Sequence, residues 1–209
     1  MSTPAASPAA ARTTRVRRSR EESRALILEA LRELVRERSY AELSVGEIMD
    51  RAGIGRTLFY RYFDDLGDLL RRAGREPIIE LFAAQEALGE AHDDPAGGLR
   101  DAHELGVAVY RRHGPVLRAI AEGASVDRLI AEGQERFRAQ FDELVAKTLR
   151  RLPDAGERYA NVDQTARALN LLSTSYLLDA FGREPRVSDE VAVQTLTELW
   201  LAAMGRVET

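Results

Sequence analysis

The chain has 209 residues, of which 44% are hydrophobic and 31% are charged, and this length allows a substantial core. It contains no cysteine, which excludes disulfide bonds, thiolate metal sites and a thiol nucleophile. No apolar run approaches the roughly 20 residues of a membrane helix, and residues 1–20 lack the hydrophobic segment of an export signal. We therefore expect a cytoplasmic protein with no membrane partner.

The net charge of −4 is unevenly distributed. Residues 1–63 carry 12 arginines and 8 acidic residues, a balance of +4, whereas the remainder carries 18 basic and 26 acidic residues, a balance of −8. Only the first third of the chain therefore has the charge that suits a polyanionic partner.

Residues 1–18 consist mainly of Ala, Pro, Ser, Thr and Arg, with no acidic residue. Such a segment cannot bury enough apolar surface to fold, so we predict a disordered basic arm. The arginines of this arm suit contacts with phosphates or a DNA minor groove; they are Arg12, Arg15, Arg17, Arg18 and Arg20. The alternative is a solvated tail.

Two capping boxes follow, each of which marks the start of a helix. Ser19 with Glu22 predicts a helix over 19–38, and Ser44 with Glu47 predicts a second helix that ends near Ala52. The apolar face of the first helix should pack against the second and third helices and close a three-helix core.

The glycines of Gly53-Ile54-Gly55 stop the second helix, and a third helix is expected from Arg56. Two short helices joined by a glycine turn are the layout of a helix-turn-helix, whose second helix lies in the DNA major groove. We expect base contacts from the arginines and threonine of the third helix, and phosphate contacts from its tyrosines and from the serine that caps the second helix. The predicted DNA-binding residues are Ser44, Arg56, Thr57, Tyr60, Arg61 and Tyr62. For Tyr62 the alternative is that its ring belongs to the core.

A fourth helix is predicted from Leu66, capped by Asp64 or Asp65. Gly74 and Pro77 should kink it, because proline removes one helical hydrogen bond; the alternative is a linker between domains. After it we expect a loop at 95–98, a helix over 99–112 and a short helix from Gly114-Pro115 to Gly123. A long helix should run from Ser125 to before Pro153, followed by a loop over 153–161. The last two expected helices cover 162–181, capped by Asn161 and Gln164, and 188–204. No strand-like alternation occurs, so we predict an all-α fold of about nine helices.

The helix over 162–181 is apolar nearly all the way round, so it should be covered on both sides. One face carries Asn170 and Leu177, and aromatic residues recur at helical spacing on the long helix before it. An apolar chamber with a few polar groups is the usual anatomy of a small-molecule site, although ordinary core packing is the alternative. The predicted ligand-binding residues are Tyr110, Phe137, Phe141, Leu144, Asn170, Ser173, Thr174, Leu177 and Trp200.

Catalytic and metal-binding patterns are missing from the sequence. His92, His103 and His113 have no metal-ligand spacing, and the Gly97-Gly98 pair lacks the residues of a phosphate loop. We therefore predict no enzyme activity, no metal site and no cofactor.

The run from Ala52 to Phe63, AGIGRTLFYRYF, resembles the signature of the tetracycline-repressor (TetR) family of bacterial regulators. The segments 168–172, 181–182 and 199–200 are similar to the family branch that contains the mycobacterial regulator of ethionamide activation. The resemblance implies a helix-turn-helix DNA-binding domain at 19–65 and a helical ligand-binding and dimerisation domain at 66–209.

The resemblance to that branch implies a role for Asn170, because an asparagine at this position contacts an elongated apolar ligand in the branch. It also implies that the aromatic residues at 137, 141 and 200 help to enclose the ligand. It also implies a homodimer through the last two helices, with Ala168, Leu172 and Ser175 on the contact face. The chain departs from the family at Gly55, Leu58 and Leu66, which replace a capping serine, a threonine and a lysine.

We therefore predict a ligand-responsive DNA-binding transcriptional regulator, and we favour a repressor over an activator. Its predicted partners are double-stranded DNA with a palindromic operator, a second copy of the chain and a small, largely apolar effector. The alternative function is a helical small-molecule-binding protein with a non-functional DNA-binding head.

Overall fold

The computed structural model describes residues 19–90, 95–152 and 155–205, so the predicted basic arm at 1–18 lies outside the described residues. Within the described ranges all regular structure is helical, which confirms the predicted all-α fold of about nine helices. The elements are α1 (Arg20–Glu37), the 3₁₀ turn η1 (Tyr40–Glu42), α2 (Val45–Ala52), the 3₁₀ helix η2 (Arg56–Arg61), α3 (Leu66–Ala73), α4 (Arg75–Glu90), α5 (Pro95–Gly123), α6 (Arg128–Arg150), α7 (Ala155–Arg158), α8 (Val162–Phe181) and α9 (Asp189–Ala203). None of the described helices is long and apolar enough to cross a membrane.

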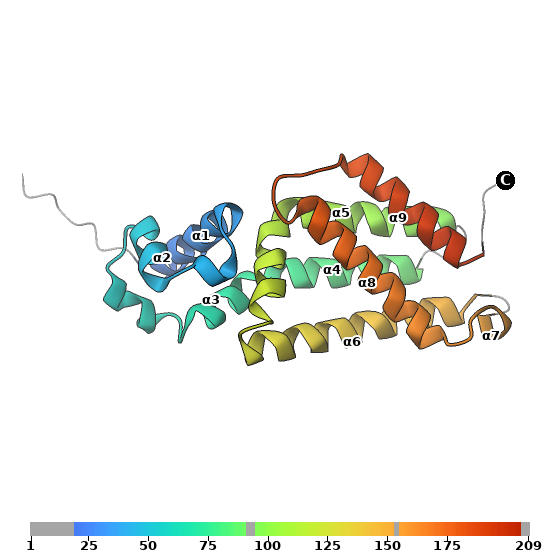
Figure 1. The fold of residues 1–209 in the computed structure, drawn as a ribbon, viewed down its shortest axis with the longest axis horizontal. Helices are drawn as coiled ribbons and strands as arrows, with labels where there is room; N and C mark the ends of the chain where they lie inside the picture. Colours follow the sequence, from blue (N-terminus) through green and yellow to red (C-terminus); the bar gives the residue numbers. More distant parts are fainter. Residues whose placement is uncertain (1–18, 91–94, 153–154, 206–209) are drawn as a thin grey trace, which may run out of the picture.

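The molecule is elongated, with α1, η1, α2, η2 and α3 at one end (Figure 1). We call these elements the head. Helices α4 to α9 form a larger body, in which α5 packs against α4, α8 and α9, and α6 packs against α4 and α8. The chain leaves the head through α3 and α4, so these two helices connect the head directly to the body.

The predicted helix starts are confirmed where a local side chain caps the helix. Ser19 and Ser44 each accept a hydrogen bond from the backbone N–H three residues later, and the glutamate at that position completes a capping box. Asp65 caps α3 and Asn161 caps α8 in the same manner. These caps satisfy backbone N–H groups that have no partner within the helix.

The head has a closely packed core of its own helices. Ile27, Ile48 and Phe59 are fully buried and Phe63 is 1% exposed, which confirms the predicted three-helix core. The same apolar cluster extends to α3 and to Val116 on α5. The head therefore packs directly on the body and is not separated from it by a flexible linker.

The prediction of a loop at 95–98 and a break at Gly114-Pro115 was wrong, because α5 runs unbroken from Pro95 to Gly123. Gly114 serves close packing: a Cβ there would lie 2.1 Å from the carbonyl oxygen of Phe181 at the end of α8. Pro115 remains inside the helix and cannot donate its helical hydrogen bond, which bends a helix without ending it. Figure 1 shows this bend, beyond which the last part of α5 turns toward the head and α6.

Three other boundaries differ from the prediction. Helix α6 begins at Arg128 rather than Ser125, because the Asp127 side chain accepts from the N–H groups of Leu129 and Ile130 and is the actual cap. The predicted loop over 153–161 contains the short helix α7. The predicted kinked fourth helix is two helices, α3 and α4, with Gly74 between them and Pro77 in the first turn of α4.

Candidate functional site

The turn of the head is built around a glycine in a left-handed conformation. Gly53 has φ +64° and ψ +35°, a region that suits glycine, and it ends α2. Ile54 follows, is 9% exposed, and donates its N–H to the carbonyl of Met49 at 3.0 Å. The apolar side chain thus fixes the corner from which η2 leaves.

The predicted recognition helix is a 3₁₀ helix, not an α-helix. Its hydrogen bonds span three residues, from Leu58 N–H to Gly55 and from Tyr62 N–H to Phe59, both at 2.9 Å. Phe59 and Phe63 anchor the segment in the head core, with ring centroids 5.6 Å apart. Leu58 and Tyr62 pack against that core from its edge.

The polar side chains of η2 lie on the solvent face. Arg56, Thr57, Tyr60 and Arg61 are exposed, and Tyr60 reaches 63% exposure. In the described part of the chain, neither Arg56 nor Arg61 forms an ion pair. By contrast, Arg51 on α2 is held by Glu33 and Glu37 on α1. The arginines of η2 are therefore available to an external anion.

Two of the predicted phosphate-binding residues have structural partners. The Ser44 hydroxyl lies 2.9 Å from Glu47 Oε2 in the capping box and remains at the surface. Tyr62 is half-buried against the head core. The DNA-contact roles of these two residues, and of the exposed residues of η2, remain predictions.

The body encloses a cavity of about 570 Å³ between α4, α5, α6, α8 and α9. Eight of the nine predicted ligand-binding residues line it: Tyr110, Phe137, Phe141, Asn170, Ser173, Thr174, Leu177 and Trp200. Leu144 does not. Along α6 the lining stops at Phe141, because Val145 and Leu149 beyond it belong to a packed apolar core.

Several polar groups of the cavity wall already have hydrogen-bond partners within the chain. Trp200 Nε1 donates to Ser173 Oγ at 2.9 Å, and Asn170 Nδ2 donates to Asp142 Oδ1 at 2.7 Å. Burial raises the pKa of Tyr110 to about 12, while a side-chain hydrogen bond with Thr174 lowers that pKa in part. The phenol is therefore neutral near pH 7, and few wall groups remain free for a ligand.

Sequence reasoning missed His103, because we tested the histidines only for metal-ligand spacing. His103 Nδ1 lies 3.0 Å from Thr197 Oγ1, and the ring packs edge-on against Trp200 with centroids 5.5 Å apart. Burial lowers the pKa of His103 to about 4, so the imidazole is neutral near pH 7. The spacing of four, three and four along Leu99, His103, Gly106 and Tyr110, which all line the cavity, was the available signal.

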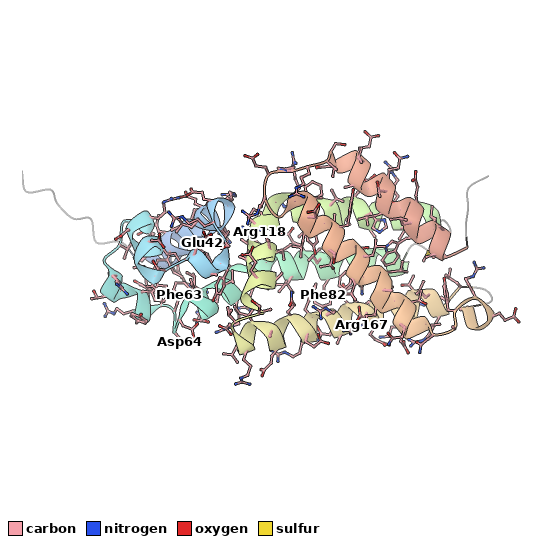
Figure 2. The ribbon with its side chains drawn as sticks, viewed as in Figure 1. Glu42, Phe63, Asp64, Phe82, Arg118 and Arg167 are labelled. Atoms are coloured by element: carbon pink, nitrogen blue, oxygen red, sulfur yellow. The ribbon has the colours of Figure 1, made fainter. Side chains whose placement is uncertain are left out.

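Gln85 on α4 is a second wall residue that the sequence reading did not find. The residue is only 9% exposed, and its Nε2 atom is buried without a hydrogen-bond partner among the described residues. Phe82 on the same helix packs against Phe137 and Phe141, with ring centroids 5.2 and 6.0 Å apart (Figure 2). Helix α4 therefore contributes both aromatic support and an unused polar group to this region.

The outer surface of α8 and α9 is partly apolar. Leu172 on α8 is 41% exposed and Leu199 on α9 is 45% exposed, whereas the equally exposed Leu171 lines the cavity. Ala168 and Ser175 lie at the surface beside them. On α9, Val193, Trp200 and Met204 are buried inside the chain, whereas Leu199 faces outward.

A helix-turn-helix with an exposed arginine face, joined to a helical domain with an apolar cavity, is the architecture of a bacterial transcriptional regulator. Residues 27–73 match the family model described as bacterial regulatory proteins, tetR family.

Among the described residues, no group of His, Asp or Glu side chains could hold a metal ion.

The chain is similar over nearly all its length to two mycobacterial regulators. It is 29% identical to the HTH-type transcriptional regulator EthR of Mycolicibacterium smegmatis, over 91% of each chain. It is 27% identical to EthR of Mycobacterium tuberculosis, over 98% of each chain. Together with the family match, these similarities support a TetR-family transcriptional regulator that resembles EthR.

Solved structures show the same fold at lower sequence identity. A TetR-like transcriptional regulator from a Rhodococcus species superposes with a TM-score of 0.71 at 18% identity, covering 91% of this chain and 100% of that chain. The TetR-family regulator PfmR from Thermus thermophilus gives 0.69 at 22% identity, with 88% and 99% covered. The relatives and fold neighbours are transcriptional regulators, which agrees with the prediction that the chain is not an enzyme.

Proposed function

We propose that this protein is a repressor that binds a palindromic operator as a homodimer and is controlled by a small, largely apolar effector. The observation that carries the proposal is the exposed arginine face of η2 on a closely packed head. Arg56, Thr57 and Arg61 contact base edges, because an arginine binds guanine in a bidentate manner. Tyr60, Tyr62 and Ser44 contact phosphates and set the register.

The exposed apolar face of α8 and α9 supports the dimer. Leu172 and Leu199 offer apolar surface to a partner, and the small Ala168 and Ser175 allow a second helix to approach closely. A two-fold dimer places two heads about one DNA turn, roughly 34–36 Å, or a multiple of it apart. The operator is then a palindrome.

The cavity supports control by an effector. Its aromatic wall favours an apolar molecule, and the buried, unpartnered Nε2 atom of Gln85 favours one with a hydrogen-bond acceptor. Helix α4 lines the cavity through Ile78 and Leu81 and follows α3 of the head after Gly74. We expect α4 to adopt two conformations that place the head differently. An effector that binds one of these conformations more tightly shifts the population of head positions, by an amount set by its difference in affinity for the two.

The experiment starts with selection of bound duplexes from a random-sequence DNA pool, because such a selection works without a known operator. The proposal predicts enrichment of a palindrome whose half-sites lie about one helical turn apart. A library of small molecules is then tested for thermal stabilisation of the protein and for a change in affinity for the selected duplex. If every stabilising compound leaves DNA affinity unchanged, the proposed control by an effector is wrong.

A further inference from the structure

A buried arginine joins the head to the body at a point away from the α3–α4 connection. Arg118 lies on α5 beyond the Pro115 bend and is 9% exposed. Figure 2 labels it where the head meets the body. Its Nη2 donates to the carbonyls of Val35 at 2.6 Å and Arg38 at 3.0 Å, while its Nε donates to the carbonyl of Gly182 at 2.8 Å.

The three carbonyls belong to the C-terminal ends of two helices. Val35 lies in the last turn of α1, Arg38 is the cap of α1, and Gly182 is the cap of α8. Carbonyls at a helix C-terminus have no partner within the helix and carry partial negative charge. One guanidinium thus satisfies the ends of a head helix and a body helix together, which its planar array of five N–H donors permits.

Glu122 completes the network. It pairs with Arg118 Nη1 one helical turn away and accepts the backbone N–H of Tyr40 at 2.7 Å. A buried guanidinium is unfavourable without its hydrogen-bond partners, and another position of the head would break the bonds to Val35, Arg38 and Tyr40. The network therefore favours one orientation of α1 against α5.

Glycines provide the room for this contact. A Cβ on Gly182 would lie 3.2 Å from both Cβ and Cδ of Arg118, and 2.4 Å from the carbonyl oxygen of Leu178. Gly114 in turn allows α5 to approach the carbonyl of Phe181 at the end of α8. Helices α5 and α8 are therefore held together at the point where Arg118 reaches the head.

The same two helices line the cavity. His103 and Tyr110 lie on α5, and Ser173 and Leu177 lie on α8. We propose that Arg118 is a positioning residue that fixes the orientation of the head on α5 and α8, and so carries a change at the cavity to the head by a route separate from α4. The part of this proposal that concerns the effector rests on the proposed function, whereas the fixed orientation does not.

The test measures the distance between head and body. Because the chain contains no cysteine, Asp50→Cys on α2 and Lys147→Cys on α6, both exposed, give two defined sites for spin labels. Pulsed electron paramagnetic resonance then measures the distance between the labels. Labelled protein is diluted with unlabelled protein, so that the distance arises within one chain.

With Arg118 present, we expect one narrow distance distribution. Arg118→Met should at least double its width or shift its centre, at a temperature where circular dichroism still shows a folded protein. Arg118→Lys should not restore the narrow distribution, because an ammonium cannot reach both helix ends as a guanidinium does. Arg100→Met is the matched control: Arg100 is exposed on the same helix and pairs with Glu104 one turn away at 3.0 Å, and its loss should leave the distribution unchanged.

An unchanged centre and width in folded Arg118→Met would overturn the proposal. If Arg118→Met does not fold, Glu122→Gln weakens the same network without shortening a side chain, and a distribution as narrow as that of the parent protein would overturn it equally. Neither measurement uses DNA or an effector. A failure here is therefore separate from a failure of the random-pool selection, which tests the proposed function.

Discussion

The head and the body use their buried volume in different ways. The head buries Ile27, Ile48 and Phe59 completely, and side-chain caps hold the starts of its α-helices. The body encloses a cavity of about 570 Å³ and leaves the Gln85 Nε2 atom without a partner among the described residues. The head is thus closely packed throughout, whereas the body leaves an apolar cavity between its helices.

The largest expected effect compares one phenylalanine from each region. Phe59→Ala removes a fully buried ring of the head core and should lower the free energy of unfolding by about 3–5 kcal/mol. Phe137→Ala should cost about 1–2 kcal/mol, because its half-buried ring borders space that is already empty. Urea unfolding followed by circular dichroism measures both. Equal losses would contradict the contrast between a packed head and an open body.

The second effect is a pH dependence that belongs to the body. His103 has a pKa of about 4 in the folded chain, against about 6.5 for an unperturbed histidine. The unfolded chain therefore binds protons more readily, so this stabilisation is complete above pH 6.5 and is lost as the pH falls towards 4. By pH 5 the loss is about 2 kcal/mol.

The measurement compares urea unfolding at pH 7.5 and pH 5 for the parent protein and for His103→Gln. Carboxylates titrate in both proteins, so the difference between them isolates the histidine. The parent should lose about 2 kcal/mol more than the variant. Equal losses would show that His103 is not buried in its neutral form.

The smallest expected change in stability concerns Gln85 in the cavity wall. Gln85→Leu replaces a buried, unpaired amide with an apolar group of similar size, which should raise the stability of the empty protein by about 1 kcal/mol. Gln134→Leu is the matched control, because Gln134 lines the same cavity but is half-buried and has no buried, unpartnered atom. Its stability should change by less than about 0.5 kcal/mol. Thermal unfolding measures both, and a loss of stability in Gln85→Leu would mean that the amide has a favourable partner.

Local chemistry made much of the fold predictable. The pairs Ser19 with Glu22, and Ser44 with Glu47, place helix starts from four residues of sequence, and Gly53 places the turn. The Gly114-Pro115 pair led to a wrong prediction of a helix break, because the role of Gly114 depends on a contact far along the chain. Gly114 is a contact with Phe181, 67 residues further along the chain, and the surrounding packing keeps the helix intact around Pro115.

The cavity was predictable in outline only. The helical spacing of aromatic residues indicated most of its wall, but not which polar groups are already engaged. The hydrogen bonds of Asn170 to Asp142 and of Trp200 to Ser173 join residues 28 and 27 positions apart. In the sequence, Arg118 looks like an ordinary surface arginine paired with Glu122 one helical turn away. Only the fold brings the ends of α1 and α8 to its guanidinium.

The most direct test of the account is DNA binding by η2. Fluorescence anisotropy of a labelled duplex carrying the selected palindrome is measured with the parent protein, with Arg56→Ala and with Arg111→Ala over a salt series. We expect tight binding that weakens steeply with salt, a loss of about 1–3 kcal/mol in Arg56→Ala, and no change in Arg111→Ala. If the Arg56→Ala protein binds the duplex as tightly as the parent, or if the parent prefers it no more than a scrambled duplex, the exposed face of η2 is not the DNA-reading surface.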